Sequence, residues 1–188
     1  MIKLAVIGDP IEHSLSPLVH TTALKAIGIE CEYKRLCVKK GGLKEFLEYA
    51  IADKIDGFNL TMPHKVDILP FLSEIDAEAK RFESVNTVKV INGKLYGYNT
   101  DSDGYCESLK SANRSFNQSR VVIIGAGGVV RTLALKAAYE GASSIIILNR
   151  TAKKAVNIAE TVKQKTGCNI SGSTFNESEL SRFCSECD

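Results

Sequence analysis

The most constraining feature of the sequence is a glycine-rich turn that lies between an apolar run and a helical pattern. Residues 121–124 are valine and isoleucine, and residues 129–139 suit a helix that ends at Gly141. A buried strand, a glycine turn and a helix in this order form the phosphate-binding unit of dinucleotide-binding folds, because glycine lets the backbone turn tightly and approach a pyrophosphate. Amides at the helix N-terminus meet the negative charge. The sequence therefore predicts a dinucleotide site at Gly125, Ala126, Gly127, Gly128 and Val129.

The end of the next expected strand, at residues 144–148, indicates which dinucleotide binds. An NAD-specific domain usually has an acidic residue there, which accepts hydrogen bonds from the ribose hydroxyls. The residues present are Asn149, Arg150 and Thr151, and Lys153 and Lys154 follow within one helical turn. A guanidinium at this place suits the 2′-phosphate of NADP. The alternative is a set of ordinary solvated side chains at a helix start. We expect NADP, bound in part by Asn149, Arg150, Thr151 and Lys154.

Composition excludes several classes of partner. The chain has 188 residues, 44% of them hydrophobic, and a net charge of +2 with no block of like charge, so nothing predicts nucleic acid or a membrane surface as partner. The apolar run at residues 4–7 is too short for a signal peptide or a transmembrane helix, which favours a cytoplasmic protein. The six cysteines have no disulfide-framework spacing and are expected to be reduced. The lone C-x-x-C pair of Cys184 and Cys187 lacks further ligands, so no metal is expected.

Alternating strand and helix patterns predict an α/β fold with two domains. Expected strands lie at residues 2–7, 31–38, 55–60 and 85–91, and Asn92-Gly93 predicts a hairpin with a type I′ turn. The first helix is expected to have Ser16 as N-cap and Pro17 at N1, and a third helix to begin at Pro63. The sequence thus predicts an N-terminal α/β substrate domain with a mainly parallel sheet (1–104), a connecting helix or linker (105–117), and a partial NADP-binding Rossmann domain (118–188), with the active site in the cleft between the domains.

Polar residues follow several expected strands of the first block, where core packing does not require them. Ser14 and Ser16 lie next to a helix N-terminus, where hydroxyls and free amides hold a carboxylate; capping alone explains Ser16 but not Ser14. Alternation sends Asn59 and Thr61 to one face, with Lys65 just inside the next helix. Further polar groups are Asn86-Thr87 and Asn99-Thr100-Asp101. An isolated residue of these types is usually solvated, so the combination carries the argument.

These motifs resemble those of the shikimate dehydrogenase family, in the family's order and approximate spacing. They extend over almost the whole chain, and their set is far more specific than a nucleotide fingerprint alone. The motifs are Ser14-Leu15-Ser16-Pro17, the N-x-T-x-P-x-K string from Asn59 to Lys65, Val85-Asn86-Thr87, Asn99-Thr100-Asp101, Gly125-Ala126-Gly127-Gly128 and Asn149-Arg150-Thr151.

The resemblance implies an NADP-dependent oxidoreductase of aromatic amino-acid biosynthesis that interconverts 3-dehydroshikimate and shikimate. It implies that Lys65 and Asp101 form the catalytic pair. The hydride transfer leaves a developing alkoxide that needs a positioned proton donor, which a lysine beside a carboxylate supplies. It also implies a cytoplasmic monomer or homodimer, and a chain that lacks the family's C-terminal part. The residues that it assigns to the substrate are Ser14, Ser16, Asn59, Thr61 and Asn86.

Two alternatives remain open at this point. A member of the same family could prefer quinate or use NAD, although Arg150 argues against NAD. A truncated, non-catalytic binding module could retain the ligand residues without turnover. Retention of both Lys65 and Asp101 argues against a degenerate site, whereas the short length argues for one.

Overall fold

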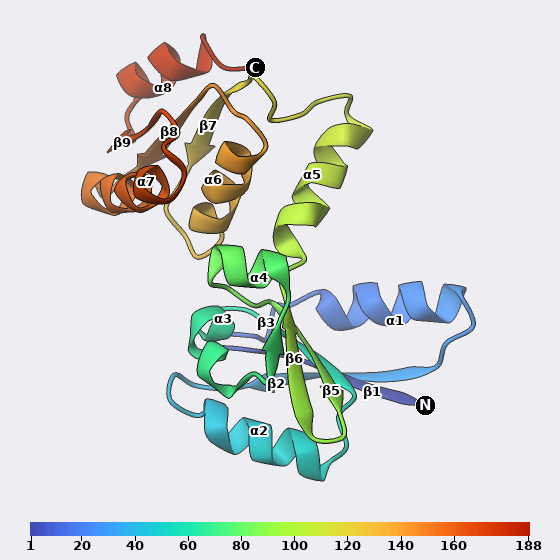
Figure 1. Cartoon of the computed structure of the whole chain (residues 1–188). Coiled ribbons are helices and arrows are strands. Elements are labelled where there is room, and N and C mark those ends of the chain that lie inside the picture. The colour runs from blue at the N-terminus through green and yellow to red at the C-terminus, as the bar shows by residue number, and fades with distance from the viewer. The chain divides into compact units, whose positions relative to one another are not determined.

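The computed structural model describes every residue from Met1 to Asp188, and the chain divides into two compact units (Figure 1). The first unit is Met1–Thr100 and the second is Asp101–Asp188. No helix of either unit combines the length and the apolar character that a membrane span requires. Each unit has its own sheet, and the two are described separately.

The first unit is built on a six-stranded sheet in the order β2-β1-β3-β5-β6-β4. β1 pairs in parallel with both β2 and β3. Because the chain moves to opposite sides of β1, right-handed crossovers place α1 and α2 on opposite faces of the sheet (Figure 1). The bounds are β1 (Ile2–Gly8), α1 (Ser16–Ala26), β2 (Cys31–Cys37), α2 (Leu43–Ala52) and β3 (Gly57–Leu60).

The rest of this sheet comes from a hairpin and one short strand. Asn92 and Gly93 have φ of 51° and 73°, as a type I′ turn requires, so the predicted hairpin is confirmed. β3 and β5 are antiparallel, and three of the five strand pairings in this sheet are parallel. The sequence patterns did not indicate β4 or α4. The bounds are α3 (His64–Asp67), η1 (Leu69–Phe71), β4 (Glu74–Ile75), α4 (Ala77–Phe82), β5 (Thr87–Ile91) and β6 (Lys94–Tyr98).

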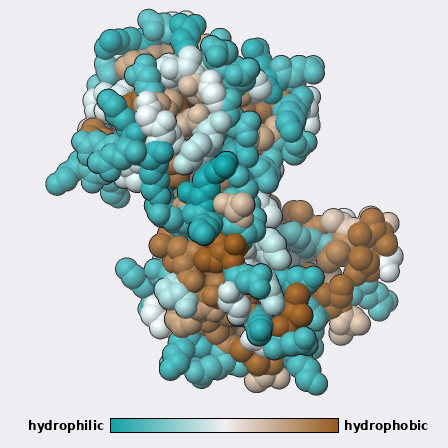
Figure 2. Space-filling model, viewed as in Figure 1, coloured by the Kyte–Doolittle hydropathy of each residue, from teal (hydrophilic) through white to brown (hydrophobic).

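The two helices on the faces of this sheet are packed very differently. α2 buries four side chains, and Phe46 meets Phe58 of β3 edge to face, with ring centroids 5.0 Å apart. α1 buries none. Leu18 and Val19 on α1 are 62% and 58% exposed, and apolar atoms gather over this helix in Figure 2. The core of the first unit therefore lies on the α2 side of its sheet.

The second unit begins with the helix α5 and continues as a βαβαβ arrangement, as predicted, followed by one more helix. Its sheet has the order β7-β8-β9 with both pairings parallel. Because the chain moves in one direction across the sheet, α6 and α7 share a face and contact each other. The bounds are α5 (Asp101–Ser111), β7 (Arg120–Ile124), α6 (Val130–Tyr139), β8 (Ser144–Asn149), α7 (Ala152–Thr166), β9 (Ile170–Thr174) and α8 (Glu177–Cys184).

Two contacts fix the helices of the second unit. The ammonium of Lys136 on α6 is buried and lies 3.0 Å from a carboxylate oxygen of Asp103 on α5 and 3.2 Å from one of Glu140. A Cβ added to Gly172 of β9 would lie 2.4 Å from the backbone at Ala155 and Val156 of α7. Only a glycine at position 172 lets this strand and this helix approach so closely.

Candidate active site

A hydrogen-bonded group of side chains lies where β3 and β5 meet in the first unit. Asn59 on β3 donates from Nδ2 to Thr87 Oγ1 at 3.0 Å and to the carbonyl of Asn86 at 3.3 Å. Thr87 donates to Asn86 Oδ1 at 3.0 Å. Asn86 Oδ1 also accepts from the Thr100 amide at 3.0 Å. The strand register places Asn59 opposite Thr87, which brings together Asn59 and Asn86, two of the residues that the sequence assigned to one site.

A tyrosine that the sequence analysis did not single out completes this group. The hydroxyl of Tyr33 on β2 donates to Asn59 Oδ1 at 2.5 Å. The ring stacks on His20 of α1, with centroids 5.1 Å apart and planes 8° from parallel. Burial, with a smaller contribution from Cys31, raises the pKa of the Tyr33 hydroxyl above its usual value. The protonated hydroxyl is therefore a fixed donor that sets the orientation of the Asn59 amide.

These side chains border a pocket of about 540 Å³ on the face of the first sheet. Its size is within the range of small-molecule sites. Apolar residues of β1, among them Ile2 and Leu4, form one part of the lining. The polar part is formed by His20, Tyr33, Asp56, Asn59, Thr87, Lys89 and Thr100.

The backbone holds Lys65 next to this polar group. The amide of Val85, the residue before Asn86, donates to the carbonyl of Lys65 at 2.8 Å. His64 beside it is fully buried, and its Nε2 lies 2.6 Å from the Val38 carbonyl, so Nε2 carries the proton. The His64 ring thus anchors the short helix α3, on which the half-buried Lys65 lies.

The predicted cap of the first helix is wrong in detail. Ser16 is the first helical residue of α1, the N-cap position falls on Leu15, and no side chain caps the helix there. Ser14 instead accepts from the Ser16 amide through Oγ at 3.3 Å. This bond lies in the turn before the helix and differs from an N-cap bond, which would end on an amide further along the first turn. Both serines are half-buried and lie within one turn.

Two further predicted residues have separate surroundings. Thr61 follows β3, where its amide donates to the Ile7 carbonyl at 2.9 Å, and its side chain packs over Gly8. Asp101 is the half-buried first residue of α5 and belongs to the second unit, whereas Lys65 belongs to the first. The pairing of Lys65 with Asp101 stays a prediction.

The glycine turn of the second unit leaves room for a ligand. Gly125 has a φ of 112°, and its amide donates to the Leu148 carbonyl at 2.7 Å, which closes the turn onto β8. A Cβ added to Gly125 or Gly127 would meet nothing within 4 Å. Gly127, Gly128 and Val129 are exposed, and α6 begins at Val130. Open space beside a helix N-terminus fits a pyrophosphate, so this turn suits a dinucleotide.

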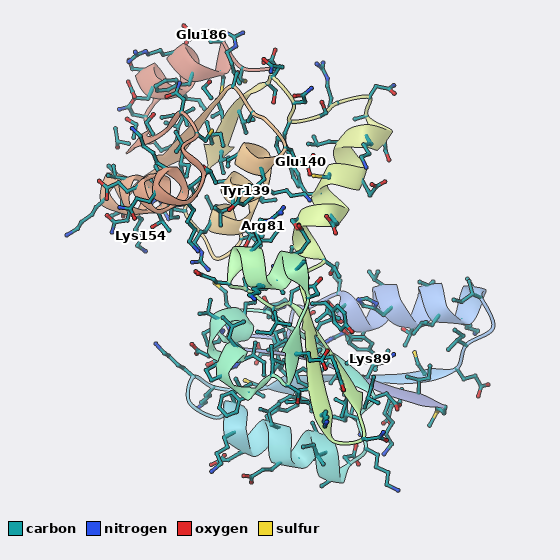
Figure 3. All side chains as sticks on the ribbon, in the orientation of Figure 1. Arg81, Lys89, Tyr139, Glu140, Lys154 and Glu186 are labelled. Atoms are coloured by element: carbon teal, nitrogen blue, oxygen red, sulfur yellow. The ribbon has the colours of Figure 1, made fainter.

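The end of β8 provides the other predicted cofactor residues. Asn149 donates from Nδ2 to the Thr151 carbonyl at 3.0 Å, and Thr151 is the N-cap of α7 without a side-chain cap bond. Arg150 is exposed between them. Lys154 extends from the first turn of α7 (Figure 3). Two cations near one strand end fit a phosphate group.

Comparisons with known proteins agree with this arrangement of residues. The sequence model described as "Shikimate dehydrogenase substrate binding domain" matches residues 6–88. The one described as "Shikimate / quinate 5-dehydrogenase" matches residues 107–178. The first match contains the Asn59 and Asn86 group, and the second contains the glycine turn and Arg150.

Individual relatives give the same result. The chain is 43% identical to the shikimate dehydrogenase (NADP(+)) of Nitrosopumilus maritimus over 160 residues, which are 85% of this chain and 59% of the relative. It is 40% identical to that of Alkaliphilus metalliredigens over 186 residues, 98% of this chain and 65% of the relative. A crystal structure of shikimate 5-dehydrogenase from Thermus thermophilus in complex with NADP(H) and shikimate aligns with a TM-score of 0.79 at 32% identity, over 90% of this chain and 62% of that one.

Length is the main difference from these proteins. The chain spans between 57 and 65% of the length of the curated relatives that it matches. Within that span, the matched regions include every predicted site residue except Asp101. The chain belongs to the shikimate dehydrogenase family.

Proposed function

We propose that the chain carries the substrate and cofactor residues of an NADP-dependent shikimate dehydrogenase, which reduces 3-dehydroshikimate to shikimate and runs in reverse. The observation that supports this most is the connected group of Asn59, Thr87, Asn86 and Thr100 beside the pocket of the first unit. A small ring with several hydroxyls needs fixed donors and acceptors on one side, and these side chains have both. The partners of the chain are therefore small molecules.

The substrate would be held by two groups of side chains in the first unit. Asn59, Thr61 and Asn86 would bind the ring hydroxyls, and Ser14 and Ser16 would bind the carboxylate. The hydrogen bonds of Asn59 to Tyr33, Thr87 and Asn86 use most of its capacity. We therefore give Asn59 the additional task of fixing Thr87 and Asn86.

Proton transfer is assigned to Lys65 and Asp101. Reduction of the ketone places negative charge on its oxygen, and the ammonium of Lys65 donates the proton that neutralises it. The carboxylate of Asp101 would orient the Lys65 ammonium. In the reverse direction the Lys65 amine accepts the proton of the alcohol.

The cofactor would be held by the second unit. Amides of Gly127, Gly128 and Val129 would bind the pyrophosphate, with Gly125 and Ala126 shaping the turn. Arg150, supported by Asn149, Thr151 and Lys154, would bind the 2′-phosphate, which favours NADP over NAD. When bound, NADP(H) supplies the hydride.

A steady-state assay tests this function. The chain is incubated with 3-dehydroshikimate and NADPH, and with shikimate or quinate and each oxidised cofactor, while NADPH or NADH absorbance is followed. Faster turnover with the NADP pair and shikimate than with NAD or quinate would support the proposal. Calorimetric binding of shikimate and NADPH without turnover would support the non-catalytic module instead. The absence of both binding and turnover would contradict the proposed function of this chain.

A further inference from the structure

One buried charge of the second unit has no part in the proposed function. The side chain of Lys136 on α6 is 9% exposed, and its ammonium lies 3.0 Å from a carboxylate oxygen of Asp103 and 3.2 Å from one of Glu140. A buried ammonium is costly unless carboxylates compensate its charge. Both carboxylate side chains are themselves exposed. The protein thus holds one cation in its interior and both counterions at its surface.

The two counterions differ in what they connect. Glu140 is on α6 itself, four residues after Lys136, so this ion pair lies within one helix. Asp103 is in the first turn of α5, which lies beside α6 (Figure 1). The ion pair with Asp103 therefore joins two helices, whereas the ion pair with Glu140 does not.

The first turn of α5 has little other support. Residues 101–104 include a glycine, which weakens the interior of a helix. Ser102 is the one buried residue of α5, and its hydroxyl has no hydrogen-bond partner. The ring of Tyr105 stacks on Phe116, with centroids 5.8 Å apart, which holds α5 to the segment before β7 and not to α6. The ion pair with Lys136 is therefore an important constraint on where this turn lies against α6.

This ion pair connects two helices that begin at proposed functional groups. α5 begins at Asp101, two residues before Asp103, and α6 begins at Val130, directly after the glycine turn. Lys136 follows Val130 by six residues, or roughly 9 Å along the helix axis. Its ammonium is already bonded to two carboxylates. The place of Lys136 therefore favours a role in spacing the two helices over a role in binding the pyrophosphate.

We propose that Lys136 is a positioning residue for Asp101. Through its ion pair with Asp103 it fixes the first turn of α5 against α6, and this sets where the Asp101 carboxylate lies relative to the glycine turn. The role rests on the proposed function, in which Asp101 assists proton transfer and the cofactor bound at the turn supplies the hydride. A displacement of about 1 Å in such an arrangement can slow turnover by about a hundred-fold.

Two single variants separate the link between the helices from the compensation of the buried charge. Asp103→Asn removes the ion pair with α5 and leaves Glu140 as the counterion of Lys136. Glu140→Gln is the matched control, because it removes a carboxylate from the same ammonium and leaves the ion pair with Asp103. Asp103→Glu keeps the charge and should restore native behaviour. At least one carboxylate compensates Lys136 in each variant, so all should fold, which circular dichroism checks.

The placement of α5 is measured at Cys106, one turn after Asp103, by mass-spectrometric mapping of alkylation with iodoacetamide. Burial raises the pKa of this thiol, Lys136 opposes the rise, and Glu140 adds to it more than Asp103 does. Loss of charge alone would therefore speed alkylation at least as much in Glu140→Gln as in Asp103→Asn. A displaced helix predicts alkylation at least about five-fold faster in Asp103→Asn only. Cys168, just before β9, is the internal reference and should react equally in all variants.

Turnover in the steady-state assay is the second measurement. Asp103→Asn should slow turnover about ten-fold with an unchanged Kd for NADPH, while Glu140→Gln stays native and Asp103→Glu recovers. Equal alkylation of Cys106 or equal turnover in Asp103→Asn and Glu140→Gln would overturn the inference, as would a failure of Asp103→Glu to recover. A native chain without turnover would contradict the proposed function, and the alkylation of Cys106 would then decide by itself whether Lys136 positions α5.

Discussion

Predicted site residues of the first unit are hydrogen-bonded within the protein, whereas several of those in the second unit are open or exposed. In the first unit, Asn59 and Asn86 are hydrogen-bonded to other side chains and to the backbone before any ligand is present. In the second unit, Gly127 borders open space, Arg150 is exposed and the Thr151 side chain makes no cap bond. The difference indicates that the proposed substrate groups are preorganised by the protein, whereas the proposed cofactor groups obtain their polar partners from the ligand.

The largest expected effect separates the scaffold of the second unit from its open turn. Gly172→Ala should lower the free energy of unfolding of this unit by about 3 kcal/mol or more, because the new Cβ would overlap the backbone of α7. Gly127→Ala is the matched control and should change stability by less than about 1 kcal/mol while weakening NADPH binding. Chemical denaturation and calorimetric titration measure the two quantities. Equal stability losses would show that the turn is packed rather than open.

Loss of the proposed proton donor should have the next largest effect. Lys65→Ala should reduce turnover about 100-fold or more, the usual contribution of a positioned acid, with a smaller effect on shikimate binding. Asp101→Asn should also slow turnover. The double variant should lose less than the product of the single losses, because the pair shares one function. Near-native turnover of Lys65→Ala in the steady-state assay would contradict the assignment of proton transfer to this residue.

Cofactor choice gives a smaller effect, confined to the second unit. Arg150→Ala should weaken NADPH binding about ten-fold and leave NADH binding nearly unchanged, since only NADPH has the phosphate that the guanidinium would pair with. Lys163→Ala, in the last turn of the same helix α7, is the control. Titrations of both variants with NADPH and with NADH measure these affinities. If the two affinities fall equally, Arg150 acts on the structure and not on the 2′-phosphate.

The smallest effect concerns Tyr33 and the preorganised group of the first unit. Because burial raises the pKa of this hydroxyl, the folded state favours its neutral form, and stability should fall as the pH rises above the unfolded value of about 10. Tyr33→Phe should cost about 1 kcal/mol at neutral pH, through the lost bond to Asn59. The variant should also lose less stability than the native protein as the pH becomes alkaline. An unchanged alkaline dependence of the unfolding free energy would mean that Tyr33 ionises as freely as an exposed tyrosine.

Local patterns predicted much of the fold. The apolar run before Gly125 and the helical pattern after it predicted β7 and α6, and Asn92-Gly93 predicted the hairpin of β5 and β6. These features depend on neighbouring residues only. β4 was missed because it has two residues and is a strand only through its parallel pairing with β6. The cap of α1 was assigned to Ser16 because the pattern cannot show that the chain turns one residue earlier.

Side-chain partners were predicted less well than the residues themselves. Asn59 and Asn86 were assigned to one site, but Tyr33 was not, because its contact depends on β2 and β3 lying on either side of β1. The alternating pattern of residues 31–38 indicated a strand and gave no neighbour for it. The burial of Asn99, which donates to the Ser84 carbonyl at 2.8 Å, is likewise visible only in three dimensions.

The most direct test of the comparison is a pair of NMR measurements on the chain labelled with nitrogen-15. In the ligand-free spectrum, the side-chain amides of Asn59 and Asn86 should exchange with water far more slowly than that of the exposed Asn157. Addition of NADPH should then shift the amides of Gly127 and Gly128 and leave those of Asn59 and Asn86 nearly unchanged. Rapid exchange of the Asn59 and Asn86 amides without ligand, or a glycine turn that does not respond to NADPH, would contradict the account.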